Sequence, residues 1–220
     1  MKKTQGFTLV EIAIVLVIIG LLLGGILKGQ EMITQAKIKN LIADYSGVSA
    51  AYHGYQDRYR AIPGDDPGAA ARWATAPAAV SGDGNGQVAG TYNNGNAACT
   101  TAVESCGWWD HLRRAGFVAG TGPTLPFNAV TGFLGVQTGD GAGAPGPALG
   151  GLVSLILCSA NLPDKMAIAI DTQMDDGDAR TGSVRGQLHV AGPNPAIAAV
   201  VPGANYAETG TNVYTICRAL

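Results

Sequence analysis

The chain has 220 residues, 47% of them hydrophobic, so it is long enough to bury a core in one or two domains. Its formal net charge of −2 and its sparse charged residues exclude a strong general attraction to nucleic acid. The 32 glycines and 11 prolines follow no G-X-Y period, so they indicate a loop-rich globular domain rather than a collagen-like chain.

The first predicted element is an apolar helix over residues 7–27, in which Glu11 is the one charged residue. At about 1.5 Å per residue this helix would be about 31 Å long, which matches the core of a bilayer. Lys2 and Lys3 precede it as they would in a signal peptide. However, the run is longer than the apolar core of a signal peptide, and no A-x-A cleavage site follows it. A membrane-spanning or membrane-anchoring helix is therefore predicted.

The next stretch, residues 28–60, is predicted to continue the same helix in amphipathic form, because apolar residues recur every three or four positions. Pro63 follows and ends it. We expect the tyrosines of this face to pack in a core under a sheet. A path for charge transfer along the tyrosines is the alternative, and only their spacing favours it. The shared face carries Ile38, Leu41, Tyr45, Val48, Tyr52, Tyr55 and Tyr59.

Residues 63–151 are predicted to hold short helices separated by loops. Asp66 is expected to cap a helix that starts at Pro67. The segment "CGWWDHLRRAG" predicts a second short helix that Gly116 closes, with Trp108 and Trp109 in a core or a subunit contact. Glycine-rich loops are predicted before it, in "SGDGNGQVAGTYNNGNAAC", and after it, over about residues 120–151.

The remaining chain is predicted to form strands. Four segments read as strands: "LVSLILC", "KMAIAID", "SVRGQLHV" and "NVYTIC". A long helix, then short helices, then strands predict an α+β fold in which an antiparallel sheet packs on the C-terminal half of the first helix.

The string "GFTLVE", from Gly6 to Glu11, stands between a short lysine-bearing leader and the apolar helix. It resembles the processing signature of type IV prepilins and pseudopilins. The resemblance is close over about the first 30 residues and loose for the helix-plus-sheet order. It implies that prepilin peptidase cleaves after Gly6 and methylates the new amine of Phe7. It also implies that Glu11 pairs with the Phe7 amine of a neighbouring copy.

This resemblance implies a domain organisation and a life cycle. Residues 1–6 would be a leader, 7–27 a transmembrane or filament-core helix, 28–60 its amphipathic continuation and 61–220 a globular α+β head. The chain would sit in the bacterial inner membrane as a single-pass protein, in contact with lipid, prepilin peptidase and the assembly platform. It would then polymerise with copies of itself into an extracellular or periplasmic filament.

Three functions follow from the resemblance, and none of them is enzymatic. The first is a structural subunit of a type IV pilus-like filament. A pseudopilin of a type II secretion system and a minor pilin for DNA uptake or adhesion stay open. Without Lys2 and Lys3 the mature chain has 12 basic and 16 acidic residues, a net charge of −4, so nucleic acid is not an expected partner. Arg58, Arg60, Arg113 and Arg114 are the residues from which a local basic patch could still form.

Many pilins carry a helix-breaking proline near the end of the apolar segment, whereas this chain reads "GGILKGQ" there. The glycines at 20, 24, 25 and 29 have low helix propensity, so the helix could stretch at them when a subunit leaves the bilayer. Alternatively, they allow close packing of neighbouring helices. Both interpretations stay open.

No catalytic residue is predicted. The segment "GAGAPG" over residues 141–146 matches G-x-G-x-x-G, but it contains Pro145, follows no clear strand and opens no helix. The sequence has no G-x-S-x-G and no Walker motif.

Four cysteines behind a membrane-targeting segment predict two disulfides in an oxidising compartment, and their spacing does not predict a zinc site. Three pairings are open. Cys158 and Cys217 end two predicted strands, which favours pairing them and leaves Cys99 with Cys106. By resemblance to pilins, residues 159–216 would form the exposed, variable surface that such a disulfide bounds.

Calcium is the one cofactor that the sequence leaves open. Asp83 and Asn85 in "GDGNGQ" resemble the opening of a calcium loop, but Asn94 stands where the closing glutamate would be. A second acidic group contains Asp171, Asp175, Asp176 and Asp178. Some pseudopilins hold calcium in a loop near their sheet. Plain turns are the alternative explanation of both segments.

Overall fold

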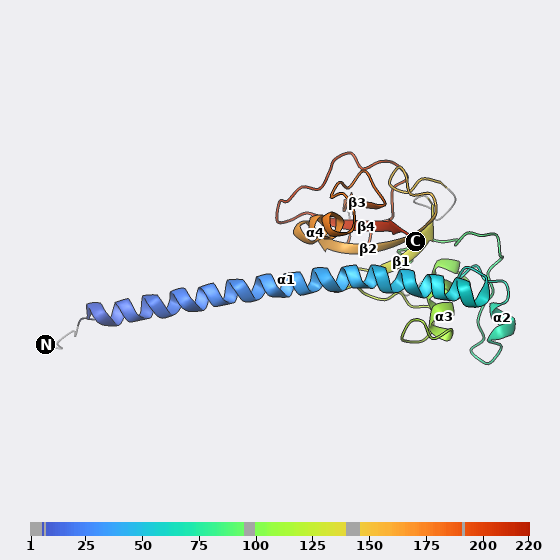
Figure 1. The fold of residues 1–220 in the computed structure, drawn as a ribbon, viewed down its shortest axis with the longest axis horizontal. Helices are drawn as coiled ribbons and strands as arrows, with labels where there is room; N and C mark the ends of the chain where they lie inside the picture. Colours follow the sequence, from blue (N-terminus) through green and yellow to red (C-terminus); the bar gives the residue numbers. More distant parts are fainter. Residues whose placement is uncertain (1–5, 7, 95–99, 140–145, 191) are drawn as a thin grey trace. The chain divides into compact units, whose positions relative to one another are not determined.

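The computed structural model describes residues 6, 8–94, 100–139, 146–190 and 192–220. Figure 1 shows α1 (Leu9–Tyr59), α2 (Ala69–Arg72), α3 (Glu104–Arg114), β1 (Leu134–Thr138), β2 (Leu155–Pro163), α4 (Asp164–Met174), β3 (Val184–Leu188) and β4 (Val213–Ala219). The chain divides into two compact units, Met1–Lys39 and Asn40–Leu220. The prediction of an α+β fold with a long N-terminal helix is confirmed.

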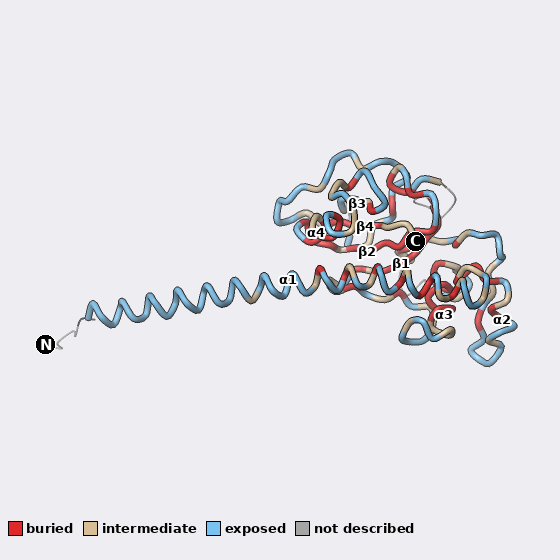
Figure 2. The backbone as a smooth tube through the Cα atoms, in the orientation of Figure 1, coloured by how far each residue is buried: buried red, intermediate tan, exposed pale blue. Residues whose placement is uncertain are grey.

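The described part of the first unit is helical from Leu9 onward, with Gly6 and Thr8 before it. Every residue from Thr8 to Lys28 is exposed, as the continuous pale blue of this stretch shows in Figure 2. The helix presents apolar side chains all round this stretch, with exposed fractions from 46% at Ile19 to 86% at Leu9. Such a surface is typical of a helix whose natural surroundings are lipid or other apolar helices.

The second unit is built on a four-stranded antiparallel sheet with the strand order β1-β2-β4-β3. The central pair is β2 and β4, in which Cys158 lies opposite Cys217 and Ile156 opposite Ala219. The register of this pair shifts between Ser159 and Leu162, which marks a bulge or irregularity in β2. Three predicted strands correspond to β2, β3 and β4.

Both faces of the central strand β2 are covered. One face of β2 carries every second residue: Ile156, Cys158 and Ala160. These residues pack in a cluster with residues of the glycine-rich loops, among them Tyr92 and Leu149. Leu155, Leu157 and Ser159 point to the other face and are also buried. Tyr45 lies in the C-terminal half of α1. Its hydroxyl donates to Ile216 O in β4 at 2.6 Å. This confirms that the helix packs on the sheet.

The tyrosine stripe of α1 reaches beyond the sheet to α3. Tyr45, Tyr52 and Tyr55 are at most 7% exposed, which confirms the predicted core packing, whereas Tyr59 is half-buried. The Tyr52 ring stacks on Trp108 of α3 with centroids 6.5 Å apart. Trp108 and Trp109 are both buried, as predicted for core residues.

The prediction of a strand over "KMAIAID" is wrong, because this segment forms α4. The alternation depended on three residues, Met166, Ile168 and Ile170, since the intervening alanines favour neither face. In the structure the buried positions are 166, 167, 170 and 171, which is the spacing of one helix face, and alanine and methionine have high helix propensity. Pro163 ends β2 immediately before it.

Two smaller predictions also need correction. The helix expected to start at Pro67 starts at Ala69, with Gly68 rather than Asp66 at the N-cap, and it has four residues. The Asp66 carboxylate instead accepts the Gly68 N–H, at 2.8 Å. In addition, β1 lies within the stretch that was predicted to be loop only. Its five residues "LGVQT" are all buried. A strand that is buried on both faces does not show the apolar–polar alternation by which a half-exposed strand is predicted.

Candidate functional site

The start of α1 forms a reciprocal capping arrangement. The backbone N–H and the hydroxyl of Thr8 both donate to Glu11 Oε2, at 2.8 Å each. In return the Glu11 N–H donates to Thr8 Oγ1 at 3.3 Å. A threonine followed three residues later by a glutamate is the sequence pattern of a capping box. The pattern stands in the sequence as "TLVE" but was not among the predicted features.

The capping box gives the Glu11 carboxylate a defined position. It holds the carboxylate beside Thr8, at the end of the helix where unsatisfied N–H groups and the helix dipole favour a negative charge. Gly6 is exposed and lies two residues before Thr8. Phe7 is outside the described residues, so the roles predicted for Gly6, Phe7 and Glu11 stay predictions.

The helix behind this carboxylate is long and apolar enough to cross a membrane. A Cβ atom added at any of the four glycines at 20, 24, 25 and 29 would meet no atom within 4 Å. These positions therefore offer open surface where another helix can approach closely. They also lie inside one continuous helix, so both interpretations of the glycines remain available.

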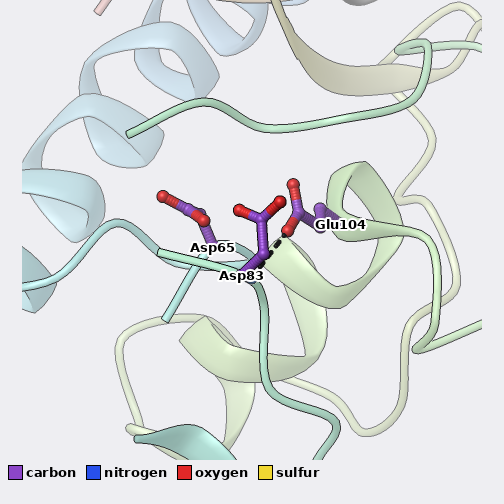
Figure 3. A group of neighbouring side chains, drawn as sticks. All are labelled: Asp65, Asp83 and Glu104. Carbon is purple, nitrogen blue, oxygen red and sulfur yellow. Dashed lines mark hydrogen bonds between the residues drawn. The ribbon is translucent and has the colours of Figure 1, made fainter. Parts of the chain in front are cut away.

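A carboxylate cluster lies in the second unit, in the loops that precede α3 and at its first residue. Figure 3 shows Asp65, Asp83 and Glu104 as neighbours, and one carboxylate oxygen of each lies within 4.8 Å of those of the other two. Asp65 accepts N–H bonds from Gly84, Asn85 and Gly86, at 2.6, 3.1 and 2.7 Å. Burial raises the pKa of Asp65, against those hydrogen bonds. Burial is also the main cause that raises the pKa of Glu104.

This cluster has the oxygen ligands that calcium prefers. It contains Asp83, one of the two residues predicted as calcium ligands. The other, Asn85, donates from its side chain to Asp83 Oδ2 at 2.8 Å and accepts the Gln87 N–H at 2.8 Å. Asp65 and Glu104 were not predicted because they lie 18 and 21 residues from Asp83, and only the folding of the loop brings them together.

The second predicted acidic group is partly assembled. Oxygens of Asp171, Asp175 and Asp176 lie within 4.8 Å of one another. Asp178 instead pairs with Arg180, at 2.6 Å. Asp171 is fully buried and accepts the Tyr206 hydroxyl at 2.6 Å. Asp171 also accepts the Gly177 N–H at 3.0 Å, and Asp175 accepts the Val184 N–H at 2.9 Å. These carboxylates hold the turn between α4 and β3, which agrees with the alternative explanation of this segment as a turn.

The pairing of Cys158 with Cys217 is confirmed, and their Cα atoms are 4.0 Å apart. Both residues are fully buried between β2 and β4. Cys106 is buried in α3 and is disulfide-bonded. Cys99 lies outside the described residues, so the pairing of Cys99 with Cys106 stays a prediction.

The four arginines of the candidate basic patch are used differently from one another. Arg113 donates to the carbonyls of Gly122 and Thr124, at 2.6 and 2.7 Å. Arg114 pairs with Asp110 at 2.6 Å. Arg58 and Arg60, at the end of α1, are exposed. Arg113 and Arg114 therefore each have partners within the same unit.

Comparison with known proteins identifies the N-terminus. Residues 1–27 match the family described as the prokaryotic N-terminal methylation motif, which is the type IV prepilin-type signature. No curated protein matches the chain. The chain is therefore type IV pilin-like at its N-terminus, and the head beyond residue 27 lies outside the match.

Proposed function

We propose that this chain is a structural subunit of a type IV pilus-like filament, cleaved after Gly6, methylated on Phe7 and polymerised through its N-terminal helix. Residues 1–6 are the leader, 7–27 the part that passes from membrane to filament core, and 28–60 the helical continuation. The inner membrane holds the subunit before assembly, and the filament extends into the periplasm or beyond the cell. The proposal includes no enzymatic activity.

The observation that carries this proposal is the capped Glu11 carboxylate in the apolar, exposed N-terminal part of α1, in which Glu11 is the one charged residue before Lys28. An ionised carboxylate in hydrocarbon is unfavourable unless it has partners. Thr8 supplies such partners within the same chain. Thr8 also holds the carboxylate at its own backbone N–H, and in the sequence Thr8 directly follows the residue on which cleavage after Gly6 would create an ammonium group.

A partner subunit offers the stronger interaction. The attraction between two opposite charges grows as the surrounding dielectric falls, so an ammonium in the apolar core of a helix bundle is a better partner than a neutral hydroxyl. The Phe7 amine of one copy can therefore replace or join Thr8 at Glu11 of the next copy. Since cleavage after Gly6 would make this amine the first group of the chain, the contact also fixes the axial offset between neighbouring subunits, as single buried polar residues do in coiled coils.

The proposal predicts that Glu11→Leu is processed normally but assembles poorly. The substitution keeps the helix apolar and leaves Gly6 and Phe7 unchanged, so cleavage and methylation should proceed. Filament yield should fall about tenfold or more, because the Phe7 amine then enters the core without a counter-charge. Mass spectrometry of the N-terminus measures processing, and quantitation of sheared or purified filaments measures assembly.

Glu11→Gln and Thr8→Ala are the matched controls. Glu11→Gln keeps the size and the capping bonds but removes the charge, so it should assemble as poorly as Glu11→Leu. Thr8→Ala removes a capping hydroxyl and keeps the charge, so its yield should fall less. Filaments at wild-type yield from Glu11→Leu would refute the proposed role.

The machine that assembles the filament decides between the two structural functions. Long surface fibres that are recovered by shearing and contain this chain would identify a pilus subunit. A deletion strain that keeps its fibres but loses protein secretion would instead identify a pseudopilin of a type II secretion system.

A further inference from the structure

The last turn of α3 lines a cavity in the second unit. The cavity has a volume of about 480 Å³, and its walls include Arg113, Arg114, Asp110, Pro77 and residues 120–122. This volume is within the range of about 300–1,000 Å³ found for small-molecule sites. The proposed filament function does not use this cavity.

Arg113 carries an uncompensated charge on the wall of the cavity. Its three hydrogen bonds all go to backbone carbonyls, those of Ala119, Gly122 and Thr124, at 3.4, 2.6 and 2.7 Å. The guanidinium carbon lies 5.9 Å from the centre of the Trp109 ring, so an apolar surface borders it on one side. Among the residues that the structure describes, Arg113 forms no ion pair. A half-buried cation in such surroundings favours the binding of an anion.

Arg114 is placed next to it by a buried carboxylate. Arg114 Nε donates to Asp110 Oδ2 at 2.6 Å, and the Asp110 side chain is 1% exposed. One terminal nitrogen of Arg114 donates to Pro77 O at 2.7 Å. Asp110 therefore fixes Arg114 and balances one positive charge, so that the two arginines and Asp110 leave one net positive charge at the cavity.

The guanidinium groups keep unused donors. Each guanidinium has five N–H groups. In the described part of the chain, Nη2 of Arg113 and Nη1 of Arg114 donate to no protein atom, because the bonds of Arg113 involve Nε and Nη1 and those of Arg114 involve Nε and Nη2. The planar N–H groups of arginine match the oxygens of a phosphate or carboxylate.

The glycine at 120 lets the loop close around Arg113. Its φ is +105°, and a Cβ atom there would lie 3.3 Å from Arg113 Nε. A side chain at this position would strain the backbone and crowd the guanidinium. Because Gly120 has no side chain, the loop packs closely on Arg113. This packing fixes the guanidinium at the wall of the cavity.

We propose that this cavity binds the oxyanion of a small molecule, a phosphate or a carboxylate group, through the unused donors of Arg113 and Arg114. The charge of the whole unit restricts the ligand to a small one. Residues 40–220 hold nine of the 14 basic and 14 of the 16 acidic residues, which gives this unit a formal charge of −5. A long polyanion would be repelled, whereas one oxyanion meets mainly the local charge of the cavity.

The test is an anion titration of the full chain in detergent micelles, with ¹⁵N-labelled arginine and constant ionic strength. Inorganic phosphate is added in one series and acetate in a second, each in exchange for chloride. The side-chain Nε–H resonances of Arg113 and Arg114 should shift and saturate, whereas that of Arg180 should not. Saturation with phosphate alone identifies a phosphate ligand, and saturation with acetate alone identifies a carboxylate ligand.

Variants of the two arginines separate binding from folding. Arg114→Gln keeps the carbonyl contacts of Arg113 and should weaken the anion affinity about tenfold or more through the loss of one charged donor group. Arg113→Lys keeps the charge but loses the planar donors, so its affinity should be intermediate. Arg180→Gln is the matched control and should bind as the wild type does. Resonances that do not saturate with either anion, or an unchanged affinity in Arg114→Gln, would overturn the proposal.

Discussion

His111 is a fully buried residue whose two ring nitrogens both have backbone partners. Nδ1 accepts the Gly64 N–H at 2.9 Å, and Nε2 lies 2.8 Å from Val80 O, to which it can donate only when it carries the proton. These partners assign the neutral form with its proton on Nε2. Burial is the main cause that lowers the pKa of His111. A proton on Nδ1 would face the Gly64 N–H and break the bond between α3 and the loop after α1.

This geometry predicts that acid destabilises the head through His111. The unfolded chain has the ordinary histidine pKa near 6.5, and the folded pKa is lower, so between the two values the unfolded chain binds more protons. The contribution of His111 to stability is therefore complete above about pH 6.5 and falls as the pH decreases toward the folded pKa. Urea unfolding of the full chain between pH 7.5 and 5, spanning roughly the titration range of histidine, measures it.

His111→Gln and His53→Gln form the matched pair for this measurement. His111→Gln removes the titrating ring, so the loss of stability between these pH values should be smaller than in the wild type. At neutral pH the glutamine amide should leave the Gly64 N–H or Val80 O without a hydrogen bond. The variant should therefore be less stable than the wild type by about 1–3 kcal/mol. His53 is exposed, and its substitution should leave the profile unchanged. An equal slope in the wild type and His111→Gln would contradict the assignment.

The sequence predicted the residues of the two candidate sites, Glu11 and the carboxylate cluster, to different extents. Glu11 could be identified from the sequence because it is the one charged residue of a long apolar run and belongs to the string "GFTLVE". Its capping partner Thr8, three residues away, was found only in the structure. Asp65 and Glu104 could not be identified from the sequence, because they join Asp83 only when two loops fold against α3. A carboxylate in a polar loop gives no sequence signal until its neighbours in space are known.

Among the elements, the strands β2 and β4 are joined by the disulfide between Cys158 and Cys217. Cys158 and Cys217 are 59 residues apart and lie opposite each other in the centre of the sheet. In the chain-entropy description, closing a loop of this size stabilises the fold by about 4 kcal/mol. The double substitution of both cysteines by alanine should therefore lower the free energy of unfolding by an amount of that order. Urea denaturation of the full chain measures it.

The wild type in reductant provides the comparison for the double variant. Both cysteines are fully buried, so a reductant should act slowly on the folded chain and fast on the unfolded chain. The reductant also cleaves the disulfide of Cys106, which the double variant keeps, so reduced wild type should unfold at a urea concentration no higher than that of the double variant. Unfolding of the double variant at the same urea concentration as the oxidised wild type would show that the link does not stabilise the fold.

The longest element, α1, was predicted correctly because its apolar and amphipathic pattern extends over many turns. α1 has 51 residues without a proline, so neither its existence nor its type depended on a single position. β1 and α4 are short, and their type depended on what packs against them. For "KMAIAID" two periods fitted the sequence, and packing of the face that holds Met166 and Ile170 selected the helix.

At the scale of the whole molecule, the boundary of the compact head falls between Lys39 and Asn40, within α1. The domain organisation predicted from the sequence placed the start of the head at residue 61. Tyr45 and Tyr55 explain why the compact unit extends further back. Both are fully buried in it, and their hydroxyls bond to Ile216 O and to Asp66 Oδ2, at 2.6 Å each.

A chain of residues 40–220 should therefore fold, and a chain of residues 61–220 should not. The shorter chain lacks five large buried side chains of α1, besides Ala51, and each of the five contributes about 1.5–3 kcal/mol by burial. Together they are comparable with the total stability of a domain, about 5–15 kcal/mol. The five are Leu41, Tyr45, Val48, Tyr52 and Tyr55. Thermal unfolding followed by near-ultraviolet circular dichroism should give a cooperative transition for the chain of residues 40–220 and none for the chain of residues 61–220. A cooperative transition in 61–220 would contradict this account.

The sequence by itself determined the features of this protein that depend on neighbouring residues: the membrane-length helix, the processing signature with Glu11 in it, and the α+β order of elements. Only the tertiary structure decided that "KMAIAID" is a helix, that Asp65 and Glu104 join Asp83, and that Arg113 and Arg114 line one cavity. The physical reason is that helix periodicity and capping act within a few residues. Burial, charge pairing and cavity shape instead arise between segments that are far apart in the chain.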